Sequence, residues 1–179
     1  MLARVSTVMK LSAVLVILCV AVIALGQYTA ENCGPYAAAT KSVLPGNDKR
    51  VITVVKIQKK DLKVPEMFEK STLEADNTLE VATACAWWRF SQAAAKEGKK
   101  VLITGGFRAL LRQEYMWKCY KCECCNNGMI SAFPGKSIMG TGDALSVDGD
   151  LDWVGANASK FGFKRPTSQN PGLLIRSNQ

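Results

Sequence analysis

The stretch PGKSIMGTGDALSVDGD, residues 134–150, has the layout of a loop that feeds metal ligands into a strand. It begins with a Pro-Gly turn, continues with spaced glycines and ends in an alternating apolar run followed by acid. A metal centre needs imidazole, carboxylate or thiolate ligands. The first ligand position holds Met139, and the chain contains no histidine. The stretch therefore has the spacing of a metal site without its usual ligands.

Three carboxylates near the end of this stretch offer an alternative ligand set. Asp148 lies two positions after Ser146 and so faces the same side of a strand, and Asp143 and Asp150 are close in sequence. Such a cluster is able to bind a hard cation such as calcium. Because Asp-Gly is also a common turn pair, we favour a solvated acidic turn over residues 148–150.

Cysteines are the other reactive residues, and four of them fall within residues 119–125. Four thiolates at this spacing suffice to bind zinc or copper. An even set in an exported chain is instead typical of disulfides, which we favour. A cysteine nucleophile or a Ser-His-Asp triad would need a histidine, which the chain lacks. The six cysteines beyond residue 26 are Cys33, Cys85, Cys119, Cys122, Cys124 and Cys125.

Residues 1–26 predict a secretory signal peptide. Arg4 and Lys10 precede an apolar run over residues 11–25, which ends in a small-x-small cleavage pattern before Gln27. The run is shorter than the ~20 residues that a membrane span needs, so we favour cleavage over an uncleaved anchor. We therefore expect a secreted, extracellular protein with no membrane span after cleavage.

The charge of the chain is moderately basic. Loss of Arg4 and Lys10 with the signal peptide would lower the formal net charge from +8 to +6. Lysines and arginines are spread along the chain without an aromatic-interleaved basic ribbon, so we expect no nucleic-acid partner. Anionic cell-wall polymers or acidic glycans are possible partners for such a surface. Simple solubility is the explanation we favour.

The elements that must position these residues fit a single α+β domain with a small sheet. We divide the remaining chain into an N-terminal extension with a first strand, residues 27–78, and a core, residues 79–179. Residues 27–50 are turn-rich, and Trp153 is expected to face inward. Strands are predicted over 51–57, 101–104 and 144–147, and helices over 79–97, 107–119 and 151–160.

Four stretches occur in an order and at gaps that resemble a known family. They are Gly105-Gly106-Phe107-Arg108 with Gln113; Pro134-Gly135-Lys136-Ser137-Ile138-Met139 continuing through Gly142, Ala144 and Ser146; Trp153 with Asn157-Ala158 and Phe161-Gly162-Phe163; and Asn170-Pro171-Gly172-Leu173. Together they resemble the VanY-like D-alanyl-D-alanine carboxypeptidases, zinc peptidases of the Hedgehog/DD-peptidase fold. The resemblance covers roughly residues 79–175 and implies a small, mainly antiparallel sheet flanked by helices.

The departures from the family pattern concern the groups that do its chemistry. The family binds zinc through a histidine and an aspartate of the central motif and a histidine of the last motif. These positions hold Met139, Ser146 and Leu173, and the general-base glutamate falls at Asn170. A neutral thioether, a protonated hydroxyl and an alkyl group make a poor zinc site, and an amide accepts no proton. We therefore expect zinc to be lost and no cofactor to replace it.

The resemblance also implies roles for residues that are retained. Arg108, Gln113 and Ser137 become candidate ligand-binding residues, and an arginine at position 108 is able to hold a carboxylate in a bidentate fork. Anchoring of the local loop is an equally good role for Arg108. A family-like loop implies a disulfide between Cys119 and Cys125, which would leave Cys122 and Cys124 to bond with Cys33 and Cys85.

These points favour a secreted, catalytically inactive homologue that binds a peptide, peptidoglycan-like or protein ligand in the former substrate groove. One alternative is an active peptidase with an atypical metal site built from Asp148 and cysteines. Another is a disulfide-stabilised structural or matrix protein. Asn157-Ala158-Ser159 is a glycosylation sequon, but this asparagine falls where the family has one for packing, and both roles remain open.

Overall fold

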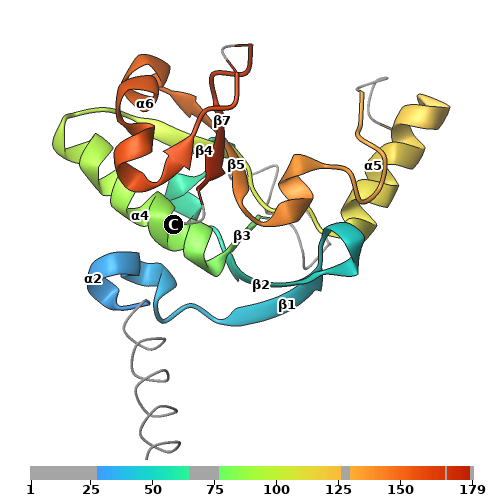
Figure 1. Cartoon of the computed structure of the whole chain (residues 1–179), viewed down its shortest axis with the longest axis horizontal. Coiled ribbons are helices and arrows are strands. Elements are labelled where there is room, and N and C mark those ends of the chain that lie inside the picture. Colours follow the sequence, from blue (N-terminus) through green and yellow to red (C-terminus); the bar gives the residue numbers. More distant parts are fainter. Residues whose placement is uncertain (1–27, 65–76, 126–129, 168, 178–179) are drawn as a thin grey trace, which may run out of the picture.

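The computed structural model describes residues 28–64, 77–125, 130–167 and 169–177. The predicted signal peptide lies outside the described residues. Figure 1 shows an α+β fold in which helix α4 lies between two small sheets. The predicted fold class is confirmed. In the described part of the chain, no helix is both long and apolar enough to cross a membrane.

The first sheet is antiparallel and has the order β1-β2-β3. Its strands are β1 (Lys41–Pro45), β2 (Val51–Lys56) and β3 (Thr78–Glu80), and the short helical segments around them are α2 (Ala30–Cys33), η1 (Gly34–Tyr36), η2 (Asn47–Lys49) and η3 (Lys59–Asp61). Strand β2 alternates between exposed and buried residues over its first half, as expected for a sheet with one solvated face. The buried hydroxyl of Tyr36 donates to the Asp61 carboxylate over 2.7 Å and connects η1 to η3.

The second sheet is also antiparallel and has the order β4-β5-β7-β6. Its strands are β4 (Val101–Gly105), β5 (Ala144–Gly149), β6 (Phe163–Lys164) and β7 (Leu173–Arg176). The register between β4 and β5 shifts between Ile103 and Gly105, where a bulge-like irregularity occurs. The central position of β5 brings its residues next to both β4 and β7.

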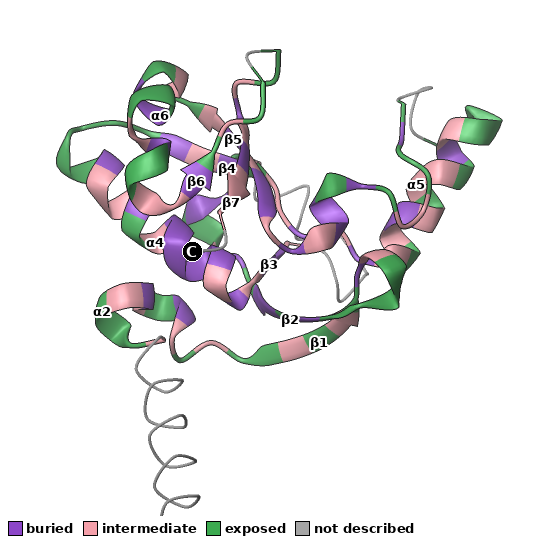
Figure 2. Cartoon of the chain, in the orientation of Figure 1, coloured by how far each residue is buried: buried purple, intermediate pink, exposed green. Residues whose placement is uncertain are grey.

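Helix α4 (Val81–Lys96) supplies the main hydrophobic core. Its Trp87 and Phe90 are fully buried, and the Phe90 ring lies 5.1 Å from that of Trp153 and 5.9 Å from that of Phe163. Trp153 is 8% exposed, so its predicted inward orientation is confirmed. Figure 2 shows the buried residues of α4 concentrated in the first part of the helix. The remaining helical segments are α5 (Leu110–Cys122), η4 (Ile138–Thr141), α6 (Leu151–Asn157) and η5 (Ala158–Phe161).

Several element boundaries differ from those expected. Residues 41–45 form a strand inside the segment expected to be turn-rich, and β3 occupies the expected start of helix 79–97. Helix α5 begins at Leu110 rather than at 107, because Phe107 is used in a bridge to Thr78. Strands β6 and β7 were not predicted. The division at 78/79 remains a prediction, and β3 runs across it.

Candidate functional site

Three of the four residues that the resemblance assigns to the family's chemical positions lie together at one end of the second sheet. Ser146 of β5 pairs with Gly105 of β4 on one side and with Leu173 of β7 on the other. A Cβ atom placed on Gly105 would lie 3.7 Å from Met139 Cε and 3.8 Å from Ser146 Cβ. Directly paired residues present their side chains on the same face of a sheet. Met139, Ser146 and Leu173 therefore share one face, around Gly105.

Asn170 belongs to the turn that enters this cluster. Its backbone carbonyl accepts a hydrogen bond from Leu173 N over 3.1 Å, and the residue itself is exposed. The fold thus brings Met139, Ser146 and Leu173 around one point, with Asn170 on the adjoining turn. We name these four residues the substituted site.

Local backbone contacts determine how Met139 reaches this place. The Met139 carbonyl accepts from Arg108 N over 2.9 Å, which connects η4 to the segment before α5. Helix η4 ends at Gly142, which has a positive φ of 88° that suits glycine. A Cβ at Gly142 would also lie 3.1 Å from Ile52 and 3.2 Å from Glu80. This glycine therefore allows η4 to turn directly into β5.

The donor atoms at the substituted site do not fit zinc. Met139 offers a thioether, Ser146 a hydroxyl and Leu173 no donor, and none of them carries charge. Among the described residues, one group of three Cys, Asp or Glu side chains is close enough to share an ion, namely Cys122, Cys124 and Cys125. This group lies at the end of α5, and its sulfur atoms are all in disulfides.

A polar chain starts at Arg108, whose backbone N–H bonds the Met139 carbonyl, and contains two of the candidate ligand-binding residues. Arg108 Nη1 donates to Gln113 Oε1 over 3.0 Å. The Gln113 amide donates in turn to Ser131 Oγ over 2.9 Å and to the Ala132 carbonyl. Gln113 is 1% exposed, so these contacts orient it and, through it, Arg108. Burial lowers the pKa of Arg108 below its ordinary value, and the charge of Arg112 lowers it further.

Ser137, the third candidate, is buried and begins η4. Its carbonyl accepts from Asn47 Nδ2 over 2.8 Å and from Gly140 N over 2.9 Å. Sequence analysis did not single out Asn47 or Ser131. Asn47 lies 90 residues from its partner and Ser131 lies 18, and neither belongs to a motif that would have indicated the contact.

The carboxylates near residues 143–150 do not form a cation site. Asp143 pairs with Arg176, Asp148 with Lys63, and the Asp150 carboxylate accepts from Lys100 N over 2.7 Å. The hydrogen bond from Lys63 lowers the pKa of Asp148, and the one from Gly149 N adds to this. The three groups have separate partners. Asp148 lies near the end of β5 and Asp150 precedes α6, so the residues expected to form an acidic turn lie between a strand and a helix.

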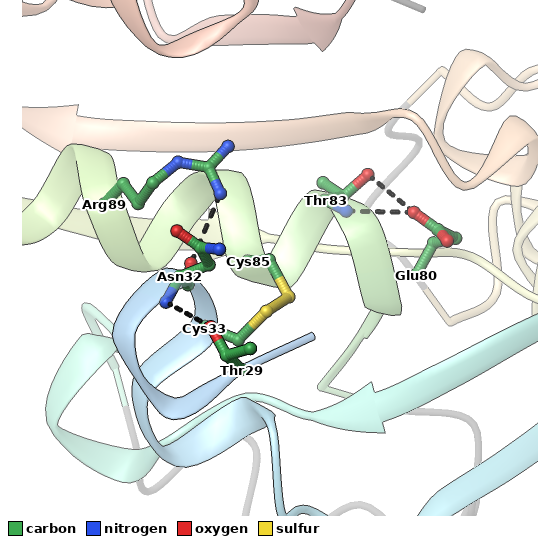
Figure 3. Close-up of a disulfide and its surroundings, with 7 residues drawn as sticks. All are labelled: Thr29, Asn32, Cys33, Glu80, Thr83, Cys85 and Arg89. Carbon is green, nitrogen blue, oxygen red and sulfur yellow. Dashed lines mark hydrogen bonds between the residues drawn. A yellow bond between two sulfur atoms is a disulfide. The ribbon is translucent and has the colours of Figure 1, made fainter. Parts of the chain in front are cut away.

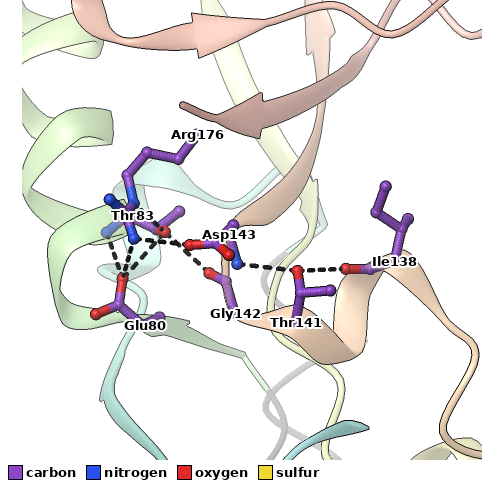
Figure 4. A network of polar contacts seen from close by, with 7 residues as sticks. All are labelled: Glu80, Thr83, Ile138, Thr141, Gly142, Asp143 and Arg176. Carbon is purple, nitrogen blue, oxygen red and sulfur yellow. Dashed lines mark hydrogen bonds and ion pairs between the residues drawn. The ribbon is translucent and has the colours of Figure 1, made fainter. Parts of the chain in front are cut away.

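Asp143 belongs to a second polar network, shown in Figure 4. Arg176 Nη2 lies 2.7 Å from Asp143 Oδ1 and 3.5 Å from Glu80 Oε2, and Arg176 Nε donates to Thr83 Oγ1 over 3.2 Å. The Glu80 carboxylate accepts from Thr83 N over 2.9 Å and so caps α4. We name Glu80, Thr83, Asp143 and Arg176 the arginine network. Strand alternation places Asp143 on the opposite face of the sheet from Ser146.

The arginine network borders a hollow of about 410 Å³. Its wall carries both charge signs and comes largely from the first sheet and the start of α4. The lining residues are Tyr28, Lys41, Arg50, Val51, Ile52, Thr53, Glu80, Val81, Thr141, Asp143 and Arg176.

The disulfides correct one of the expected pairings. Cys119 is joined to Cys125, as the resemblance implies, but Cys33 is joined to Cys85 and Cys122 to Cys124. The expectation that Cys122 and Cys124 would bond with Cys33 and Cys85 is wrong. Figure 3 shows Cys33 of α2 lying directly against Cys85 of α4, with 4.1 Å between their Cα atoms. The other four cysteines lie at the end of α5, on the opposite side of the molecule in Figure 1.

Asn157 and Trp153 have structural contacts. The Asn157 amide donates to the Trp153 carbonyl over 3.0 Å, and the Trp153 indole donates to Glu97 Oε2 over 2.7 Å. Gly162 follows with a φ of 79° and ends η5. These contacts explain why this helix end needs an asparagine and a glycine, whether or not Asn157 is glycosylated.

Comparisons with known proteins match this fold. The family model described as VanY: D-alanyl-D-alanine carboxypeptidase matches residues 76–172. A structure of the LdcB LD-carboxypeptidase, described as revealing the molecular basis of peptidoglycan recognition, is 21% identical with a TM-score of 0.54, covering 70% of this chain and 68% of that one. No curated protein sequence matches with significance.

Two further solved structures are more distant. VanYB in complex with D-alanine-D-alanine is 17% identical, has a TM-score of 0.48, and covers 60% of this chain and 76% of that one. The L,D-carboxypeptidase DacB from Streptococcus pneumonia is 16% identical, has a TM-score of 0.45, and covers 78% and 86% respectively. The LdcB likeness concerns the fold, whereas the family match spans more than half of the 179 residues. This chain belongs to the VanY D-alanyl-D-alanine carboxypeptidase family.

Proposed function

We propose that this protein is a secreted, catalytically inactive member of its family that binds a peptide or a cell-wall-like ligand beside the substituted site. The observation that carries the proposal is the convergence of Met139, Ser146 and Leu173 around Gly105, with Asn170 on the adjoining turn. Peptide hydrolysis by this family's route needs a metal-activated water and a proton acceptor. The side chains at these positions supply neither.

Arg108 is the group best suited to meet a ligand. It is half-buried, its backbone N–H bonds the carbonyl of Met139 in the substituted site, and Gln113 accepts from one of its Nη atoms. A guanidinium with one side held by the protein keeps other N–H donors for a carboxylate. A ligand with a terminal carboxylate, such as the end of a peptide or of a cell-wall stem peptide, fits this chemistry.

An active peptidase with an atypical metal site is less well supported. Asp148 would be its carboxylate ligand, but Asp148 is paired with Lys63 on the exposed surface. The cysteines that would complete the site are in disulfides. Both sets of side chains would have to give up their present partners before they could bind an ion.

Metal analysis and a hydrolysis assay on the purified protein test the inactive role. We expect less than about 0.1 equivalent of zinc and no hydrolysis of peptides ending in D-Ala-D-Ala, since three ligands are missing. Close to one equivalent of tightly bound zinc together with hydrolysis would overturn the proposal.

Binding is tested separately by calorimetry with D-Ala-D-Ala-terminated peptides and by sedimentation with insoluble peptidoglycan. Arg108→Lys keeps the charge but loses the fork, and we expect it to weaken binding by about tenfold or more. Arg89→Gln, a change to an arginine on α4 that contacts Asn32, is the matched control and should leave binding unchanged. If neither probe binds, the protein is better described as a disulfide-stabilised structural protein.

A further inference from the structure

The two disulfides at the end of α5 differ in exposure from the one that joins α2 to α4. Cys33 and Cys85 are 0% and 3% exposed. Cys122, Cys124 and Cys125 are all exposed, whereas Cys119 is 1% exposed. We name Cys119, Cys122, Cys124 and Cys125 the cysteine cluster. Because an incoming thiol must reach a sulfur atom, the cluster and the buried disulfide are expected to react very differently.

The sulfur atoms of the two cluster disulfides lie next to one another. Cys124 Sγ is 3.7 Å from Cys125 Sγ, and the sulfurs of Cys122, Cys124 and Cys125 lie within 4.8 Å of one another. A thiolate released from the Cys122–Cys124 bond would therefore already lie beside a sulfur of the Cys119–Cys125 bond. This is the arrangement that thiol–disulfide exchange requires.

The Cys122–Cys124 disulfide also contributes little to the fold. It joins residues separated by 2 positions, whereas Cys33 and Cys85 are separated by 52. In the chain-entropy description, the stabilisation from a disulfide grows with the loop that it closes. Opening of the Cys122–Cys124 bond is therefore expected to leave the fold intact, whereas opening of the Cys33–Cys85 bond is not.

We propose that the cysteine cluster is a thiol-exchange site, at which a small thiol of the glutathione class forms a mixed disulfide with Cys124. The incoming thiol loses its proton to solvent, and its thiolate attacks Cys124 Sγ. A new S–S bond forms, the Cys122–Cys124 bond breaks, and Cys122 leaves as a thiolate. No oxidant or reductant is consumed, because one disulfide replaces another.

The released Cys122 thiolate can then transfer the exchange to the second bond. It attacks Cys125 Sγ, a Cys122–Cys125 bond forms, and Cys119 leaves as a thiolate that takes a proton from solvent. Attack on Cys124 is the productive choice for geometric reasons. Attack on Cys122 would release Cys124, whose nearest acceptor is its neighbour in sequence, and a bond between adjacent cysteines distorts the backbone between them.

The experiment treats the native, oxidised protein with reduced glutathione at neutral pH. Samples are quenched at intervals with N-ethylmaleimide and mapped by mass spectrometry. We expect a glutathione adduct on Cys124, maleimide on Cys119 or Cys122, and an intact Cys33–Cys85 bond. Exchange at the cluster should be at least about tenfold faster than at the buried bond, since access is limiting there.

Two variants separate the steps. In Cys119→Ser/Cys125→Ser, the adduct should still form, but the transfer is blocked and maleimide should label Cys122. In Cys122→Ser/Cys124→Ser, the fast adduct should disappear. Circular dichroism should show that both variants keep the native fold.

The proposal is overturned if the wild-type cluster exchanges as slowly as the Cys33–Cys85 bond. It is also overturned if Cys122→Ser/Cys124→Ser forms the adduct at the wild-type rate, because the Cys119–Cys125 bond would then be the reactive one. If the wild-type adduct is found wholly on Cys122, the assignment of Cys124 as the attacked sulfur is wrong.

Discussion

Near the start of β5, the two faces of the second sheet differ in the charge of their side chains. On one face, the substituted site gathers Met139, Ser146 and Leu173, all of them uncharged. On the other, Asp143 joins Glu80, Thr83 and Arg176 in a charged network whose members contact one another directly (Figure 4). In this chain, charged side chains join secondary-structure elements on one face, whereas the substituted site on the other face is uncharged.

The two faces are expected to differ in how strongly a substitution on them lowers the stability of the fold. The arginine network connects the start of α4 to β7 and to the residue before β5, so removal of one member leaves charges without their partners. The residues of the substituted site carry no such dependence, because none of them is paired with a charge. Metal ligands introduced at the substituted site should therefore be tolerated, whereas substitutions in the arginine network should lower the stability of the fold.

Introducing three zinc ligands at the substituted site should have the largest effect, which is on the amount of zinc that the protein binds. Met139→His/Ser146→Asp/Leu173→His places two imidazoles and a carboxylate on the face that now surrounds Gly105. Three such ligands form a catalytic type of zinc site, so we expect about one equivalent of bound zinc in the variant and essentially none in the unmodified protein. Elemental analysis after dialysis measures this difference.

The two-ligand variant Met139→His/Ser146→Asp is the matched control and should bind zinc much more weakly. A folded triple variant that takes up no zinc would show that the three positions do not converge closely enough. Addition of Asn170→Glu to a zinc-loaded triple variant would then ask whether the missing proton acceptor can also be supplied.

Loss of the central arginine of the network should have the next largest effect. Arg176→Met leaves Asp143 and Glu80 without their cation at side chains that are 25% and 21% exposed. We expect the free energy of unfolding to fall by about 2–4 kcal/mol, somewhat below the cost of breaking a fully buried pair. Urea denaturation measures the change.

Lys63→Met, which breaks an exposed pair with Asp148, is the comparison and should lower the free energy of unfolding far less than Arg176→Met, because solvent screens an exposed pair. Equal losses in the two variants would contradict the distinction between the network and an ordinary surface pair.

Local sequence patterns predicted the strands and helices whose own residue types favour that structure. The run at 51–57 and the alanine-rich segment at 79–97 became β2 and α4 with small changes at their ends. The order and gaps of the motifs indicated that Met139, Ser146 and Leu173 belong together, and strand pairing brings them into one cluster. Strand β7 was missed, although Leu173 lies in it, because its four residues show no alternation of their own.

Contacts between distant residues could not be predicted. Arg176 has no motif around it, and its partners Asp143 and Glu80 lie far from it in sequence, Asp143 by 33 residues and Glu80 by more, so only the folded chain shows the network. The disulfide pairing failed for a similar reason. Cys33 lies against Cys85 because α2 packs on α4, and residues 27–50 were expected to be turn-rich, without a helix.

Replacement of Gln113 should lower the free energy of unfolding by a smaller amount, through contacts close to that residue. Gln113→Ala removes the acceptor for Arg108 and the donor to Ser131 and Ala132, of which Ser131 is buried. We expect a loss of about 1–3 kcal/mol in the free energy of unfolding, mainly from polar groups left without partners. A double-mutant cycle with Arg108→Ala isolates the pair. A coupling energy near zero would mean that Gln113 does not hold Arg108.

The smallest effect is expected at Asp148, where the charge is on the surface. The hydrogen bond from Lys63 lowers the pKa of Asp148 in the folded protein relative to the unfolded chain. A carboxyl with a lowered folded pKa stabilises the fold above its unfolded pKa, about 3.9, and this contribution is lost as the pH falls through the folded pKa. Asp148→Asn should therefore lower stability slightly at neutral pH and not at strongly acidic pH. Urea denaturation across the acid range measures this pH dependence, with Asp152→Asn on α6 as the control. A loss of stability that does not change with pH would rule out the Lys63–Asp148 pair as the cause of that loss.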